Sequence, residues 1–299
     1  MKILSAVLAA STISLLANNV PAADVDFITL ANERRTGTTV WVRMNPEDVL
    51  VFKSTDRYVL HGRRLVINAR TIRVDGQFTI QQFGDSDTPL PKQGTAPQPQ
   101  AKPKASRTSG RKGADGATGS QGNQGAQGDP GKNAPMIVLD IERVLGSGVL
   151  TIINAGGIGG QGQQGSQGGT GGAGEEGAKG VDGFAHCMET GGDGGYGGRG
   201  GKGGTGGTGG MGGNGGTVKI SAPAKVAVDS KHIVVDVSGG TGGDPGPGGL
   251  KGQGGAGGAG GSGSIHCSGG RGQPSLGDGD PGDEGKPGEK GKPGQIVVI

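Results

Sequence analysis

The chain has 299 residues, of which 72 are glycine, 16 are proline and only 3% are aromatic, and its formal net charge is +3. Such a composition cannot fill one continuous hydrophobic core, and glycine in strict triplet spacing is typical of extended helices of the polyproline II type. The net charge is small for this length, so it does not indicate a nucleic-acid partner.

Residues 1–22 predict a secretory signal peptide. Lys2 supplies a short positive start, an apolar stretch runs to Leu16, and Val20-Pro21-Ala22 offers small residues for cleavage. The apolar stretch is too short to span a bilayer, and no later segment is long enough. We therefore expect an exported protein, secreted, at the cell surface or periplasmic, with no membrane span.

Residues 24–83 have the character of β-sequence, with short apolar runs between polar turns. Residues 84–135 begin as a Pro- and Lys-rich stretch and continue as Gly-X-Y triplets. The early cations of this insertion, such as Lys92 and Lys104, could contact anionic envelope polymers, although a solvated extended arm is the favoured interpretation.

A longer repeat underlies the triplets. Residues 65–80 align without a gap with residues 137–152, and residues 218–235 form a third copy that contains two single-residue insertions. Residues 295–299 resemble the opening strand of a fourth. The alternating apolar residues predict strands buried on one face, so residues 24–83, 136–154, 217–238 and 295–299 are expected to form an all-β repeat base.

The expected base is β-solenoid-like or a layered sheet, with essentially no helix once the signal peptide is removed. The glycine-rich residues 155–216 and 239–294 would then be insertions between copies, each running out, turning and returning. At about 3.1 Å per residue, each arm would be roughly 78–87 Å long. The insertion 84–135 could do the same.

Two resemblances follow from the triplets. Gly277-Asp278-Gly279-Asp280-Pro281-Gly282 and the residues up to Gly294 resemble bacterial collagen-like proteins, as does the stretch from Gly113 to Gly119. That resemblance implies a trimeric stalk that displays other domains at the cell surface.

The tract from Gly191 to Gly216 departs from collagen, because it is mostly Gly-Gly-X and contains no proline. It is similar to intramolecular polyglycine II bundles, as in phage tail-tip adhesins and the snow flea antifreeze protein. This second resemblance implies that one chain folds back on itself, with backbone hydrogen bonds between its arms. A monomer is favoured and a trimer stays open.

Cys187 and Cys267 are the only cysteines, and each lies at the expected tip of a glycine hairpin. In an exported protein a disulfide is the leading interpretation. The alternatives are a zinc site formed by His186, Cys187, His266 and Cys267, for which adjacent His and Cys is poor spacing, or free thiols.

No Ser-His-Asp or paired-carboxylate arrangement stands out, so no catalytic residue and no cofactor are predicted. We expect a non-enzymatic structural or adhesive protein that presents a rigid rod, with an extracellular surface or polysaccharide as its partner. The alternatives are a trimeric collagen-type stalk, a glycan- or ice-binding module, and an enzyme.

Overall fold

The computed structural model describes residues 22–53, 56–90 and 112–299. The expected signal peptide lies outside this range except for its last residue. Most of the Pro-rich stretch, including Lys92 and Lys104, also lies outside it. Within the described ranges, no helix has the length and apolar composition needed to cross a membrane.

Strands dominate the regular structure. The N-terminal region contains β1 (Asp24–Asp26), α1 (Phe27–Glu33), β2 (Arg35–Thr36), β3 (Thr39–Arg43), β4 (Val49–Lys53), β5 (Arg57–Val59), β6 (Arg64–Asp75), β7 (Gln77–Gln81) and the 3₁₀ turn η1 (Asp85–Asp87). The remainder contains β8 (Ile137–Leu145), β9 (Val149–Ile153), β10 (Val181–Asp182), β11 (Cys187–Glu189), β12 (Thr217–Ile220), α2 (Ala222–Asp229), β13 (Ile233–Asp236) and β14 (Gln295–Val298).

Two mainly parallel sheets form the base. The larger has eight strands and follows the path β1-β4-β6-β8-β12-β14, with β3 also beside β6 and β2 beside β3, and the smaller follows β13-β9-β7-β5. The expected mostly β fold is therefore confirmed. Its strands come from segments that long insertions separate in the sequence.

The strand register reproduces the sequence repeat. Leu65 pairs with Ile137 and Phe78 pairs with Leu150, both 72 residues apart. Ile137 then pairs with Val218, and Leu150 with Ile233, so the third copy carries the two extra residues. β14 pairs with β12 as the opening strand of a fourth copy.

Apolar side chains from both sheets meet between them. Leu65, Ile67, Ile137 and Leu139 are all fully buried there. At the N-terminal end of the base, the rings of Phe27, Phe52, Phe78 and Tyr58 cluster, with centroids of Phe27 and Phe52 4.8 Å apart and stacked. This cluster gives the base a core despite the low aromatic content of the chain.

Two short helices correct the expectation of an essentially helix-free chain. α1 begins at Asp26, whose carboxylate accepts a hydrogen bond from the Thr29 N–H at 3.0 Å, and it buries Phe27, Leu30 and Ala31. α2 occupies residues that the third repeat copy assigned to a strand, and Ala224 and Ala227 are its buried residues. Pro in the first turn and apolar residues three apart favour helix over strand at this position.

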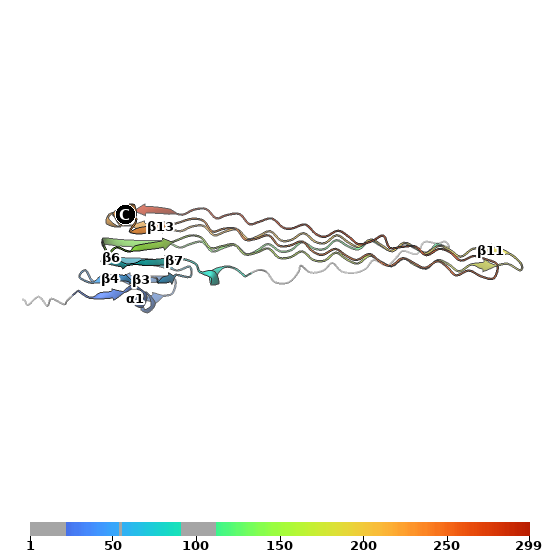
Figure 1. Cartoon of the computed structure of the whole chain (residues 1–299), viewed down its shortest axis with the longest axis horizontal. Helices are drawn as coiled ribbons and strands as arrows, with labels where there is room; N and C mark the ends of the chain where they lie inside the picture. Colours follow the sequence, from blue (N-terminus) through green and yellow to red (C-terminus); the bar gives the residue numbers. More distant parts are fainter. Residues whose placement is uncertain (1–21, 54–55, 91–111) are drawn as a thin grey trace, which may run out of the picture.

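Five glycine-rich segments leave the base and run side by side to the far end of the molecule (Figure 1). We call them segments one to five, and together the glycine bundle: residues 113–134, 156–180, 191–216, 239–263 and 269–294. In each, every third residue donates its backbone N–H to a carbonyl of another segment. Gly116 N–H, for example, donates to Tyr196 O at 2.7 Å, and Gly119 N–H donates to Arg199 O at 2.8 Å.

The bonds place the five segments in two layers. Consecutive segments run antiparallel, as in Gly160 N–H to Asp129 O (2.7 Å), and alternate segments run parallel, as in Gly159 N–H to Thr241 O (2.9 Å). Segments one, three and five therefore form one layer, and segments two and four form the other.

Segment three lies in the middle and bonds to all four other segments. Its Gly201 N–H donates to segment two and its Gly200 N–H donates to segment five. A Cβ on Gly201 would overlap the Ser120 carbonyl, and one on Gly200 would overlap the Gly252 carbonyl. Two of every three positions must therefore be glycine here, which explains the Gly-Gly-X pattern.

Candidate functional site

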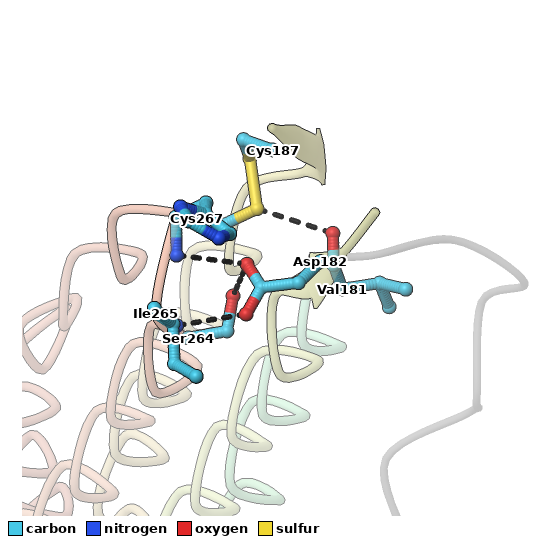
Figure 2. The surroundings of a disulfide bond; sticks show 7 residues. Val181, Asp182, Cys187, Ser264, Ile265 and Cys267 are labelled. Carbon is cyan, nitrogen blue, oxygen red and sulfur yellow. Dashed lines mark hydrogen bonds between the residues drawn. A yellow bond between two sulfur atoms is a disulfide. The ribbon is translucent and has the colours of Figure 1, made fainter. Parts of the chain in front are cut away.

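The far end of the glycine bundle is closed by a disulfide. Cys187 and Cys267 are bonded, with their Cα atoms 4.8 Å apart and a separation of 80 in the sequence (Figure 2). Cys187 lies on β11, which pairs with β10 in the turn between segments two and three. Cys267 lies in the turn between segments four and five, so the bond joins the two turns. We refer to residues 181–189 and 264–268 as the tip.

Asp182 provides a second link between the two turns. Its carboxylate accepts hydrogen bonds from Ser264 Oγ at 2.6 Å, Ile265 N–H at 2.8 Å and His266 N–H at 2.9 Å (Figure 2). The bond from Ser264, followed by those from the two backbone N–H groups, outweighs desolvation and holds the pKa of Asp182 below its usual value.

Large apolar side chains project from the tip into solvent. Phe184 is 104% exposed and Ile265 is 90% exposed, one from each turn, and Met188 and Val181 are partly exposed beside them. No sequence pattern predicts a role for these residues. Their position at a turn between glycine segments is the sequence signal that could have indicated exposed apolar side chains. They are exposed because the tip is too small to bury them.

The predicted cysteine pair is thus brought together. The alternative zinc site is wrong, because it requires two free thiolates and both cysteines are in the disulfide. His186 and His266 are exposed side chains of the tip. Among residues 22–53, 56–90 and 112–299, no cluster of three or more His, Cys, Asp or Glu side chains is placed to hold a metal ion.

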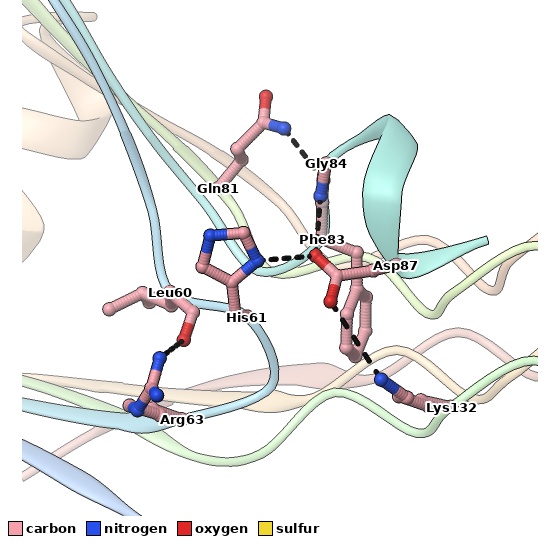
Figure 3. Close-up of polar contacts among 8 residues, drawn as sticks. All are labelled: Leu60, His61, Arg63, Gln81, Phe83, Gly84, Asp87 and Lys132. Carbon is pink, nitrogen blue, oxygen red and sulfur yellow. Dashed lines mark hydrogen bonds and ion pairs between the residues drawn. The ribbon is translucent and has the colours of Figure 1, made fainter.

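A polar contact fixes the opposite end of the bundle to the base. Asp87 of η1 accepts the Gly84 N–H at 3.0 Å, lies 2.9 Å from His61 Nδ1 and lies 3.7 Å from Lys132 Nζ (Figure 3). Burial raises the pKa of Asp87, but the Gly84 N–H, His61 and Lys132 together lower it more, so the net shift is downward. The contact ties a base loop to segment one at the point where the bundle begins.

Ion pairs cross the outer face of the glycine bundle between segments three and five. Arg199 Nη2 lies 3.3 Å from Asp280, and Lys202 Nζ lies 2.7 Å from Asp283. These pairs occupy the side-chain row that the Gly-Gly-X residues form. They keep that face polar and charged.

No protein-family model matches the chain, and no curated protein matches it. A solved structure that matches is the springtail antifreeze protein from Granisotoma rainieri, described as a bundle of nine polyproline type II helices whose crystal waters match the ice lattice. The identity is 31%, over 60% of this chain and 97% of that one, with a TM-score of 0.14. A TM-score this low says nothing about the fold or the function of this chain.

Proposed function

We propose that the protein is an exported, non-enzymatic rod that holds an adhesive tip away from a β-solenoid base. The observation that carries the proposal is the ladder of backbone hydrogen bonds at every third residue across five segments of one chain. Period-three bonding between extended glycine-rich segments is the expected pattern of polyglycine II helices, and side-by-side packing gives them a stiffness that a single glycine-rich strand lacks.

A rod made within one chain is favoured over a collagen-type trimer. In the described bundle, each segment finds its hydrogen-bond partners in other segments of the same chain. Segment three has glycine at two positions of each triplet and no proline, so it lacks the stiffening that a triple helix uses. The expected species is therefore an elongated monomer.

The tip has the properties of a contact surface. The disulfide and Asp182 fix two turns against each other, which lowers the conformational entropy lost on binding. Phe184 and Ile265 offer apolar area there, and aromatic side chains in particular dominate contact energies at interfaces. A stiff rod with such a tip suits adhesion to a partner surface.

Sedimentation and small-angle X-ray scattering test the rod. We expect the mass of one chain and an elongated particle, whereas a trimer or an expanded coil would overturn the proposal. Adhesion is tested with beads coated with the full chain on surfaces of immobilised protein and neutral glycan. Phe184→Ala with Ile265→Ala should abolish bead adhesion, and the matched pair Met211→Ala with Leu250→Ala, exposed on the bundle, should retain it.

Ice binding is the alternative that the same helices would allow. It requires a flat row of small side chains, and Thr205 and Thr208 begin one on segment three. The charged pairs of Arg199 and Lys202 interrupt that row. Thermal hysteresis in a solution of the exported chain would favour this alternative over adhesion.

A further inference from the structure

The outer surface of the eight-stranded sheet carries a straight row of side chains across five strands. Strand register pairs Trp41 with Val66, Val66 with Val138, Val138 with Lys219, and Lys219 with Val297. On β3, β6, β8 and β12 the neighbours of these residues along the strand are buried in the core, so alternation directs the row outward, whereas on the edge strand β14 the neighbours Ile296 and Val298 are exposed. Adjacent strands are about 4.8 Å apart, so the row is about 19 Å long.

Trp41 is the single tryptophan of the chain, and 46% of it is exposed. Trp41 lies at one end of the row, beside partly exposed valines, and presents a flat apolar surface that the described part of the fold leaves partly uncovered. Flat apolar strips of this kind match the C–H faces of pyranose rings. The ring NH of tryptophan adds a hydrogen-bond donor at the edge of that surface.

Polar side chains flank the apolar row. On one side lie Arg43, Asn68 and Asp140, in which Asn68 Nδ2 donates to Asp140 Oδ2 at 2.7 Å. Asn68 and Asp140 line a groove of about 250 Å³ together with Met44, Pro46, Ala69, Arg70 and Glu142. On the other side lie Thr39 and Arg64, which pair with each other across β3 and β6.

The flanks are cationic at the end of the row near Trp41, whereas Asp140 and the Arg70–Glu142 ion pair lie farther along one flank. In the part of the chain that the structure describes, the guanidinium groups of Arg34, Arg43 and Arg64 have no carboxylate partner. Arg34 Nη1 donates to the Arg43 carbonyl at 2.9 Å, which places these two arginines together. The Nε of Arg64 is buried without a hydrogen-bond partner. Positive charge therefore borders the row where Trp41 lies.

We propose that this face, centred on Trp41 and Arg43, binds an acidic polysaccharide. Sugar rings would lie along the row of Trp41, Val66 and Val138, and their carboxylate or sulfate groups would pair with the flanking arginines, which match such groups bidentately. Asn68 and Asp140 would bond the hydroxyls. The inference rests on the proposed function, because it assigns the base of the rod to an envelope or matrix glycan and leaves the tip free.

A single-stranded nucleic acid is the competing anionic ligand. It would require several aromatic side chains to stack successive bases, whereas this face offers one aromatic followed by valines. The observations therefore favour the glycan, and the nucleic acid becomes an outcome of the test.

The test measures binding of the full oxidised chain to immobilised sodium alginate, a polyuronate, with neutral dextran and single-stranded DNA as comparisons. We expect alginate binding that weakens with added salt, no dextran binding, and weaker DNA binding. Trp41→Ala and Arg43→Ala should each weaken alginate binding by about tenfold. The matched control Arg57→Ala, an exposed arginine on β5 of the other sheet, should leave it unchanged.

Thermal unfolding of each variant checks its folding, and the exposed Arg43 carries the test if Trp41→Ala unfolds. The proposal would be overturned if the wild-type chain did not bind alginate, bound dextran equally well, or bound DNA more tightly. It would also be overturned if the Trp41→Ala and Arg43→Ala variants both bound alginate as tightly as wild type. The rod is tested separately by scattering. An elongated monomer that ignores alginate removes this inference alone, whereas an alginate-binding trimer or coil removes the proposed rod alone.

Discussion

Asn68 and Asp140 are 72 residues apart in the sequence, yet the amide of one donates to the carboxylate of the other at 2.7 Å. Arg70 and Glu142, at the same separation, form an ion pair of 3.1 Å on the next outward position. The separation equals the repeat in the sequence. Each copy therefore lies directly on the last, although an insertion of the glycine bundle separates them.

Replacing a glycine inside the bundle should break the ladder locally. In Gly201→Ala the new Cβ overlaps the carbonyl of Ser120, and relief requires two segments to separate. We expect the free energy of unfolding to fall by about 1–3 kcal/mol or more, measured by urea denaturation. The control is Gly272→Ala, whose Cβ comes no closer than 3.6 Å to any atom, and it should change stability by about 0.5 kcal/mol at most. Equal effects would contradict direct packing of segment three.

Removing the disulfide should destabilise the tip before the base. Because it closes a loop of 80 residues, the chain-entropy account gives an upper value of about 4.5 kcal/mol, and Cys187→Ser with Cys267→Ser should cost about 2–4 kcal/mol. Hydrogen exchange should show faster exchange in the turns of the tip and little change in the base. Reduced wild-type protein is the control and should behave like the double variant; unchanged exchange on reduction would show that the bundle alone fixes the tip.

Asp182 should make the tip sensitive to acid. Its pKa is lowered from the ordinary 3.8 by the hydrogen bonds from Ser264, His266 and Ile265. A depressed pKa means that the stabilisation is complete above about pH 4 and is lost as pH falls through the folded-state pKa. Asp182→Asn should therefore resemble wild type at low pH and expose the tip to faster hydrogen exchange at pH 7. A difference between the two proteins that is constant across pH 2–7 would refute this role.

Two phenylalanines, one buried in the aromatic cluster of the base and one exposed at the tip, allow a matched comparison. Phe78 is 1% exposed and contacts Phe27 and Phe52, whereas Phe184 at the tip is 104% exposed. Phe78→Ala should lower the free energy of unfolding by about 3–5 kcal/mol. Phe184→Ala should change the free energy of unfolding by about 0.5 kcal/mol or less while weakening adhesion through the tip. If both variants lost similar amounts of stability, Phe184 would have to be buried against another part of the protein in solution.

The triplet frames and the longer repeat predicted which segments extend and which pair as strands. Glycine at every third position leaves few alternatives where backbones must touch, and alternating apolar residues fix which face of a strand is buried. The register of Leu65 with Ile137 confirmed the alignment made from sequence. Local sequence patterns were enough to predict these elements because the glycine triplets and the β-repeat each recur along the chain.

The helices were not predicted, and of the tip contacts only the disulfide was. α2 begins with Ala222-Pro223 and spaces its buried Ala224 and Ala227 three apart, but Val226 and Val228 gave the same stretch an apparent strand alternation. Asp182 could not be recognised at all, because its partners Ser264 and His266 lie 82 and 84 residues away. Contacts of that kind depend on where two turns end in space.

Backbone hydrogen bonds join consecutive glycine segments and also alternate ones, and this constrains how the length of the bundle can change. Adding a triplet would lengthen a segment by about 9 Å, but in one segment alone it would leave unmatched donors and displace the turn that carries Cys187 or Cys267. The length of the rod therefore depends on all of its segments, and a protein with a longer or shorter rod would have to add or lose triplets in every segment together. The base imposes no such limit, because its strands meet in the same register however far the insertions travel.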